Sequence, residues 1–175
     1  TIEPHSSGDK YQLVDFYTLF YYKFIANNIA KDEQWWSHNF ESRSVESWQG
    51  LSFELLCMLH GGQIKKALGI SGMSCDLSAW RVVANKDLSI PGAQIDLIID
   101  RSDRMTHLCE IKFSQGPYRI TSEYEQKLRE RMELFRELTK SRKSLVHTFI
   151  TTYGVADGIH SSVVHSEVTM GALFE

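Results

Sequence analysis

The pattern of apolar and polar positions divides the chain into a helical N-terminal part and a mixed C-terminal part. Aromatic and aliphatic residues recur at helical spacing between 13 and 30, which predicts a helix with Asp9 as its cap. The segment 32–44 is polar apart from three aromatic residues and is predicted to be a connecting loop. A second helix is predicted over 44–60, with Ser44 as its cap and an apolar stripe along one side.

The second half of the chain is predicted to contain several strands and one helix. β-Rich segments bounded by turn residues predict strands over 79–84, 94–100 and 107–113. Helical periodicity returns over 120–138. The order of helix, three strands, helix and strand predicts an α/β fold with a mixed central sheet flanked by helices. The remaining expected strands are 145–153 and 163–170.

Composition excludes several classes of protein. A hydrophobic content of 42% and a charged content of 23% are typical of a globular domain rather than a disordered chain. The sequence has no run of 18 apolar residues and begins without the apolar stretch of a signal peptide, so we expect a cytoplasmic protein with no membrane partner. Cys57, Cys75 and Cys109 form no C-x-x-C pair and show no zinc-ligand spacing, so we expect reduced thiols.

Charge is unevenly distributed along the chain. The formal net charge is −3, which is not typical of a free-standing nucleic-acid-binding protein. Residues 119–143, however, contain eight Lys and Arg residues and five Asp and Glu residues. The rest of the chain contains eleven Lys and Arg residues and seventeen Asp and Glu residues. A basic strip beside an acidic pocket suits a nuclease that uses a metal. A solvated helix face of mixed charge would give the same count.

Three charged residues are notable because two strand-like segments bring them close together. Asp96 lies in an apolar run that is expected to be covered on both faces, where a carboxylate is costly unless it is compensated. In the next strand, the period of two places Glu110 and Lys112 on one face. If Asp96 lies opposite either of them, all three share a face. If it lies opposite Ile111, its carboxylate points away.

Two carboxylates opposed on neighbouring strands repel each other and favour a cation between them. Their oxygens suit a hard divalent ion, so we expect Mg²⁺ or Mn²⁺ bound by Asp96 and Glu110. Lys112 indicates phosphodiester hydrolysis, because an ammonium offsets the charge that develops on phosphate oxygens. Glu54, at the margin of the apolar stripe of its helix, is the fourth candidate catalytic residue and metal ligand. The alternative for Glu54 is a position facing solvent.

The Glu-x-Lys spacing is weak evidence by itself. With about 25% charged residues, a chain of this size contains roughly one such pair by chance. A second copy, Glu125-Gln126-Lys127, does occur on a predicted helix. The strand context of the first copy, and the apolar strand with Asp96 fourteen residues earlier, favour a functional site. The alternative is a Glu110–Lys112 salt bridge on a sheet surface.

At these residues the chain resembles the PD-(D/E)XK nuclease superfamily, with Asp96 in the first acidic position and Glu110-Ile111-Lys112 as the (D/E)-x-K. Gln94-Ile95 stands where the Pro of the motif's name would be expected. The predicted elements over 44–153 match the αβββαβ order of that family. The resemblance implies a restriction-endonuclease-like core, a Mg²⁺ cofactor and DNA as substrate.

A second resemblance is to the C-terminal part of archaeal-type AAA+ ATPases. Residues 11–24 resemble the segment that closes the ATPase part, and 47–54 and 151–154 fit the same group. The chain has no initiator Met and no G-x-x-x-x-G-K-[ST], so it is expected to be a fragment that cannot itself bind ATP through a P-loop. The resemblance implies that 1–43 is the end of an ATPase region with a linker, and that 44–175 is the nuclease-like domain.

The sequence therefore predicts a metal-dependent nuclease-like domain that hydrolyses DNA as an endonuclease or exonuclease. The expected partners are DNA, the ATPase domain of the same full-length protein and, as a further option, a second copy of the chain. The first alternative is a non-catalytic module that keeps the fold, binds nucleic acid or a protein, and regulates the ATPase. The second is a structural lid that acts through the aromatic N-terminal helix. The intact acidic and basic set favours an enzyme, whereas the low net basicity favours a binding module.

Overall fold

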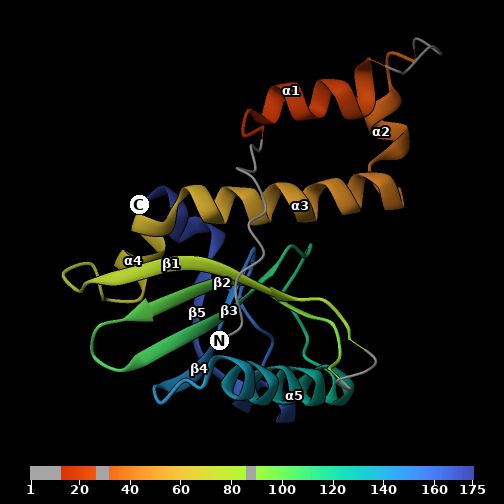
Figure 1. Ribbon diagram of the computed structural model, residues 1–175. Coiled ribbons are helices and arrows are strands. Elements are labelled where there is room, and N and C mark those ends of the chain that lie inside the picture. Colours follow the sequence, from red (N-terminus) through yellow and green to blue (C-terminus); the bar gives the residue numbers. More distant parts are fainter. Residues whose placement is uncertain (1–12, 27–31, 86–89) are drawn as a thin grey trace. The chain divides into compact units, whose positions relative to one another are not determined.

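The computed structural model describes residues 13–26, 32–85 and 90–175 (Figure 1). The chain forms two compact units, Thr1–Glu46 and Ser47–Glu175, which divide within helix α3 (Arg43–Leu59). The boundary expected from the sequence lay three residues earlier, between 43 and 44. Within the described ranges, no helix is both long and apolar enough to cross a membrane.

The described part of the N-terminal unit contains helical segments over 16–25 and 35–39. Helix α1 (Phe16–Phe20) continues directly into a π-helical segment, η1 (Tyr21–Ile25). The Asp15 carboxylate caps α1 by accepting a hydrogen bond of 2.7 Å from the backbone N–H of Thr18. The cap predicted from the sequence, Asp9, lies outside the described residues.

The prediction of a connecting loop over 32–44 is wrong, because helix α2 (Trp35–Asn39) forms there. Aromatic packing supports this helix although the local sequence is polar. The ring of Trp35 lies 5.0 Å from the ring of Phe24, between centroids, and Trp36 lies 5.5 Å from Phe20. Packing between aromatic residues that are distant in the sequence thus overrides the local loop pattern.

Helix α3 begins one residue earlier than predicted, and its cap differs. The Ser42 hydroxyl accepts from the backbone N–H of Val45 at 3.4 Å, so Ser42 and not Ser44 occupies the capping position. A short helix, α4 (Gly61–Ala67), follows α3 directly.

A five-stranded mixed sheet forms the centre of the C-terminal unit (Figure 1). The strands lie side by side in sequence order; the first three pair antiparallel, and the last three pair parallel. Helix α5 (Ser122–Thr139) connects the first parallel pair as a crossover. The strands are β1 (Cys75–Val82), β2 (Ala93–Arg101), β3 (Met105–Lys112), β4 (Ser144–Thr151) and β5 (Val164–Thr169), and two 3₁₀ segments are η2 (Ile159–Val163) and η3 (Met170–Phe174).

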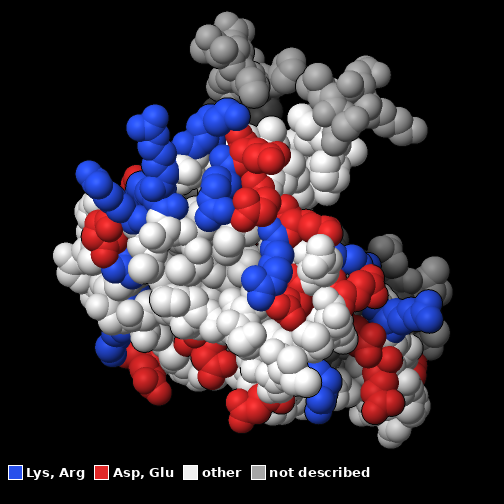
Figure 2. Space-filling model, turned by 90° about the horizontal axis from the view of Figure 1, so that it is seen from below, with Lys and Arg blue, Asp and Glu red and all other residues white. Residues whose placement is uncertain are grey.

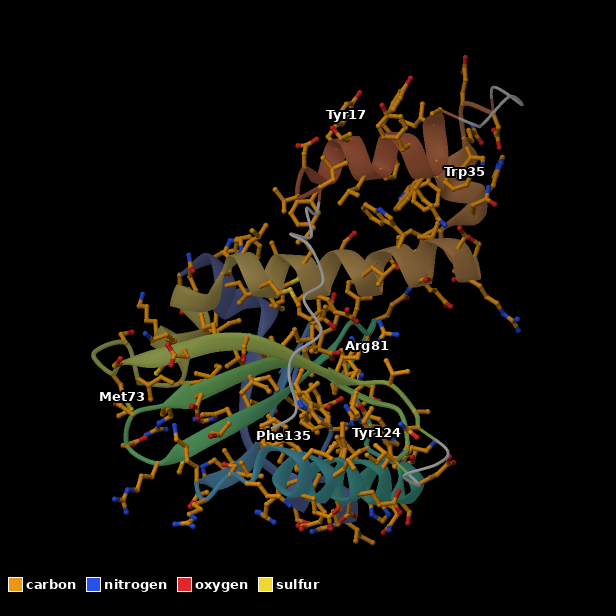
Figure 3. The ribbon with its side chains drawn as sticks, viewed as in Figure 1. Tyr17, Trp35, Met73, Arg81, Tyr124 and Phe135 are labelled. Atoms are coloured by element: carbon orange, nitrogen blue, oxygen red, sulfur yellow. The ribbon has the colours of Figure 1, made fainter. Side chains whose placement is uncertain are left out.

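Both faces of the sheet carry a hydrophobic core. On one face, Phe53 and Cys57 of α3 pack with Ile99, Cys109 and other buried side chains. The opposite face packs against α5. Figure 3 shows Phe135 of α5 near the sheet, where its ring lies 5.3 Å from that of Trp80 of β1. The predicted α/β class, with a mixed sheet flanked by helices, is therefore confirmed.

Strand β1 extends four residues further toward the N-terminus than its predicted start at residue 79. None of its eight residues is buried: five are exposed, including the run 76–79, and three are partly exposed, so the apolar signal at its beginning is weak. The strand is at an edge of the sheet and pairs with β2 alone. Backbone pairing with β2, rather than its own sequence pattern, defines where it begins.

Candidate active-site pocket

A bulge in β2 positions the first acidic residue. Ser78 of β1 pairs with Ile98, whereas Trp80 pairs with Ile95, so β2 contains one residue more than β1 across this stretch. Ile95 and Ile98 consequently both pack on the α5 side of the sheet. The period of two used to place Asp96 is therefore interrupted at Asp96 itself. Bulges of this kind redirect side chains and are frequent beside functional sites.

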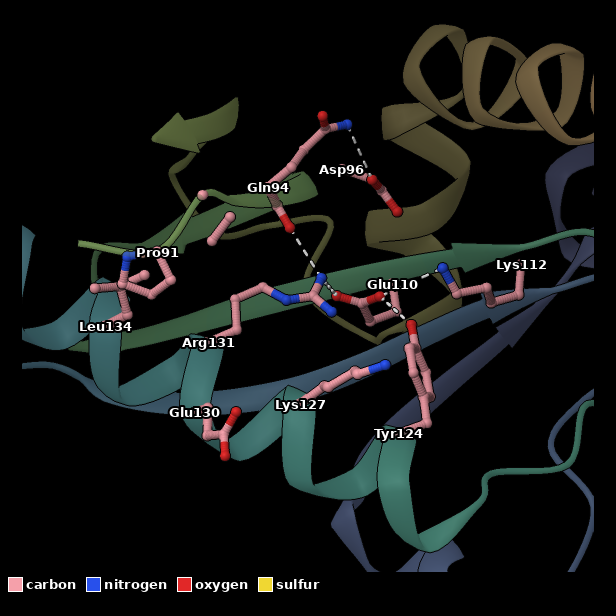
Figure 4. A pocket seen from close by; sticks show the side chains of 12 residues that line it. Pro91, Gln94, Asp96, Glu110, Lys112, Tyr124, Lys127, Glu130, Arg131 and Leu134 are labelled. Atoms are coloured by element: carbon pink, nitrogen blue, oxygen red, sulfur yellow. Dashed lines mark hydrogen bonds and ion pairs between the residues drawn. The ribbon is translucent and has the colours of Figure 1, made fainter. Parts of the chain in front are cut away.

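Asp96 lies where β2 and β3 separate. Their pairing ends at Leu97 and Cys109, one position before Asp96 would face Glu110. Instead of a strand partner, the Ile111 backbone N–H donates to Asp96 Oδ2 at 3.2 Å, and Gln94 Nε2 donates to Oδ1 at 3.4 Å. Figure 4 shows the Asp96 carboxylate apart from the groups that surround Glu110.

Glu110 is almost completely buried, with 2% of its surface exposed, and is held by three partners. Its Oε1 forms an ion pair with Arg131 Nη1. The Tyr124 hydroxyl donates to Oε2 at 2.6 Å, and Lys112 Nζ lies 3.5 Å from the same oxygen. Burial raises the pKa of Glu110, and the positive charges of Arg131 and Lys112 act in the opposite direction.

The three partners of Glu110 are partly buried. Burial and the neighbouring Glu110 charge raise the pKa of Tyr124 above its ordinary value, so Tyr124 is a hydrogen-bond donor throughout the neutral range. Lys112 Nζ lies 5.5 Å from the centre of the Tyr124 ring, within the range of a cation–π contact. These contacts hold the Lys112 ammonium beside the Glu110 carboxylate.

Glu54 lies on the α3 side of the sheet and is half-buried. Its pKa is raised, first by burial and then by the negative charge of Asp96, with a smaller contribution from Glu110. Lys112 lowers the same pKa. Glu54 is therefore close enough to the other three residues to interact with them electrostatically, although it is not part of the pocket lining.

Asp96, Glu110 and Lys112 line one pocket of about 530 Å³ between the β2–β3 hairpin and α5 (Figure 4). Three further charged residues from α5 line it as well. The lining thus contains three acidic and three basic side chains and is balanced in formal charge. The acidic residues are Asp96, Glu110 and Glu130, and the basic ones are Lys112, Lys127 and Arg131.

Tyr124, Lys127 and Arg131 were not among the residues singled out from the sequence. Lys127 was named only in the second Glu-x-Lys copy, and Arg131 was counted only as part of the basic segment 119–143. Their spacing of three and then four residues places them on one face of a helix, which was the available signal. Which face of that helix meets Glu110 depends on tertiary packing.

The donor set suits a hard divalent ion only in part. Asp96 retains lone pairs beyond its two hydrogen bonds, because an ionised carboxylate has about four acceptor sites. Both oxygens of Glu110 are already in contact with donors. Within the described residues, no group of three or more His, Cys, Asp and Glu side chains is arranged to hold a metal ion. A divalent ion held between Asp96 and Glu110 would therefore compete with Arg131, Tyr124 and Lys112 for the Glu110 oxygens.

The face of the molecule seen from below is mixed in charge. Figure 2, seen from below relative to Figure 1, shows Lys and Arg side chains interspersed with Asp and Glu on the visible face. Several cations of α5 are neutralised locally, as in the Lys127–Glu123 and Arg129–Glu125 ion pairs, both 2.6 Å long. Such exposed pairs are weak, so their lysines and arginines remain available to an anionic ligand.

Comparison with known proteins does not assign a family. Neither the protein-family models nor the curated proteins contain a match to this chain. Among solved structures, the chain is similar to the crystal structure of AF1548, a protein of unknown function, with 15% sequence identity and a TM-score of 0.42. The match covers 65% of this chain and 63% of that one, which is less than two thirds of either.

Proposed function

We propose that the Ser47–Glu175 unit is a divalent-metal-dependent phosphodiesterase that cleaves DNA, built on a restriction-endonuclease-like αβββαβ core. The order α3, β1, β2, β3, α5, β4, with the short helix α4 between α3 and β1, supports that core assignment. The observation that carries the proposal is the shared pocket. Two carboxylates and an ammonium from adjacent strands line it, together with two cations of α5.

Asp96 and Glu110 are the residues that would hold Mg²⁺ or Mn²⁺, with Glu54 near enough to contribute through water. When bound, such an ion supplies Lewis acidity toward a phosphate oxygen and toward water. Lys112 is the group of this chain that would act on the reacting phosphate. Its ammonium can orient the attacking water and offset the charge that grows on the phosphate oxygens as the P–O bond to the leaving group breaks.

The α5 cations give the pocket a means of holding a nucleic-acid strand. Lys127 and Arg131 lie one helical turn apart and line the same pocket as Lys112. Contacts between such side chains and phosphates are independent of base sequence and position a strand without specifying it. This is consistent with a nuclease whose target is selected elsewhere, and we propose the ATPase domain of the same full-length protein as that partner.

A second candidate function is a nucleic-acid-binding or protein-binding module without catalysis. The saturated environment of Glu110 favours it, because Arg131, Tyr124 and Lys112 together stabilise the carboxylate without any metal. In that case the acidic and basic residues of the pocket would be a structural network, and the low net basicity of the chain would reflect binding to a protein.

Plasmid and oligonucleotide DNA incubated with the protein and Mg²⁺ or Mn²⁺ separates the two functions. We expect divalent-ion-dependent cleavage that EDTA abolishes and that Glu110→Gln or Lys112→Met reduces on the order of 10²- to 10³-fold. Glu130→Gln, an exposed change in the same pocket, is the matched control. Cleavage that persists at full rate in both folded variants would refute the proposal, and DNA binding without cleavage by the unaltered protein would establish the second function.

A further inference from the structure

Arg131 connects the two halves of the candidate site. Its Nη1 contacts Glu110 on β3 and donates at 2.9 Å to the backbone carbonyl of Gln94 on β2, two residues before Asp96. Only 19% of its side chain is exposed. Arg131 therefore links the separated ends of β2 and β3 to α5. Its contact on β3 is Oε1 of Glu110, one of the oxygens that a metal ion would use.

The guanidinium is only partly used by these contacts. Within the described residues, Arg131 donates through Nη1 alone, which leaves Nε and Nη2 as donors. A guanidinium presents its donors in a planar fork that matches the geometry of phosphate oxygens. Arg131 lines the pocket beside Lys127, so a phosphate entering the pocket would meet both cations.

Charge balance makes the binding of a metal ion and the binding of a strand depend on each other. The lining already holds three acidic and three basic side chains. A divalent ion entering alone would place two positive charges beside Lys112 and Arg131, whereas a strand entering alone would bring phosphates close to Asp96 and Glu110. Each ligand supplies the charge that the other requires.

We infer that Arg131 exchanges Glu110 for a phosphodiester of the bound strand, so that nucleic-acid binding releases Glu110 to the divalent ion. This inference rests on the proposed function and adds an order of binding to it. A divalent ion binds weakly to the free protein and tightly to the complex with a strand. Because coupling between two ligands is reciprocal, the ion strengthens strand binding by the same factor.

The inference is tested by titrating the whole chain with Mn²⁺, following free Mn²⁺ by electron paramagnetic resonance. Titrations are made with and without a short DNA duplex that gel electrophoresis shows to remain intact. For the unaltered protein, we expect the duplex to tighten Mn²⁺ binding on the order of 10-fold, a typical coupling factor. For Arg131→Gln, we expect Mn²⁺ binding without DNA to be on the order of 10-fold tighter, with little further gain from the duplex.

Arg129→Gln is the matched control, because Arg129 lies on the same helix, pairs with Glu125 and is outside this pocket. It should behave as the unaltered protein does. Circular dichroism establishes that each variant is folded, and Arg131→Met, which keeps the aliphatic stem, replaces Arg131→Gln if the latter unfolds.

The failure of this inference and the failure of the proposed function give different results. If Mn²⁺ binding is lost in Asp96→Asn and Glu110→Gln but is no tighter in the Arg131 variant than in the unaltered protein, the exchange is refuted and the metal site stands. If Mn²⁺ does not bind, or binds equally well to Asp96→Asn and Glu110→Gln, the metal-dependent function is refuted together with the exchange.

Discussion

Glu110 and His147 are two buried polar side chains on adjacent strands, and their surroundings are opposite. Both lie on the α5 side of the sheet, with 2% and 5% of their surface exposed. Glu110 has an arginine, a tyrosine and a lysine around its carboxylate. Neither ring nitrogen of His147 has a hydrogen-bond partner among the described residues.

Their different surroundings favour the neutral form of His147 and the charged form of Glu110 on the same side of the sheet. Burial and the nearby positive charges of Arg131 and Arg129 lower the pKa of His147 to about 4, so its imidazole is neutral at pH 7. Glu110 is instead placed among donors that stabilise the ionised form. His147 is therefore neutral, whereas the Glu110 carboxylate has three side-chain partners. Burial of the Glu110 carboxylate costs free energy by desolvation, and its three partners offset that cost.

The largest expected effect comes from removing the Glu110 carboxylate. Glu110→Ala leaves the partly buried Arg131 guanidinium without its counter-charge and the Tyr124 hydroxyl without its acceptor, so we expect the free energy of unfolding to fall by about 3–5 kcal/mol. Urea unfolding followed by circular dichroism measures this. Glu130→Ala, which is exposed, should change it by less than about 0.5 kcal/mol. A loss below about 1 kcal/mol for Glu110→Ala would show that the three partners do not stabilise the fold through this residue.

A double-mutant cycle measures how much of this stabilisation comes from the Glu110–Arg131 pair. We expect Glu110→Gln and Arg131→Met to be non-additive by about 2 kcal/mol, because each single change leaves the other buried group without its counter-charge. The four proteins are compared by the same urea titration. Additivity within about 0.5 kcal/mol would mean that the Arg131–Glu110 contact contributes nothing of its own.

The unpaired imidazole of His147 predicts a specific sensitivity to acid. Between about pH 4 and its ordinary pKa of 6.5, the folded protein binds fewer protons at His147 than the unfolded chain does. Its contribution to stability is therefore complete above pH 6.5 and is lost as the pH falls toward 4. In His147→Leu, we expect the loss of stability over this range to be smaller by about 1–2 kcal/mol.

Thermal or urea unfolding from pH 7 to pH 4 measures that difference. At pH 7, His147→Leu should be as stable as the unaltered protein or more so, because an apolar side chain replaces an unpartnered polar one. His165 is an exposed histidine that lines one cavity of about 390 Å³ together with His147. His165→Gln should leave the loss of stability between pH 7 and pH 4 unchanged. If His147→Leu lost as much stability between pH 7 and pH 4 as the unaltered protein, His147 would not remain neutral in the folded protein.

The smallest effect is expected at Tyr124. Tyr124→Phe removes one hydrogen bond to Glu110 but leaves Arg131 and Lys112 in place, so stability should fall by about 1 kcal/mol. Tyr153→Phe is the control, since Tyr153 is 60% exposed. A loss for Tyr124→Phe that equals the loss for Glu110→Ala would indicate that the hydroxyl, and not the ion pair, holds the carboxylate.

Some elements of the fold could be predicted from the sequence, and others could not. Strands β2, β3 and β4 and helix α5 occur close to where their periodicity indicated, because each buries an apolar face whose spacing is visible in the sequence. Helix α2 and the start of β1 were missed. Their stability comes from aromatic packing and from strand pairing with residues distant in the sequence.

That Glu110 and Lys112 share one face of a strand follows from the sequence alone, because side chains alternate with a period of two along a single segment. The direction of the Asp96 side chain depends instead on the fold, because the bulge in β2 arises from pairing with β1 and interrupts that period. The fold also decided which face of α5 meets Glu110 and thereby brought Arg131 and Tyr124 to the carboxylate. Local periodicity is fixed by backbone geometry, whereas the meeting of separate elements depends on how their faces pack together.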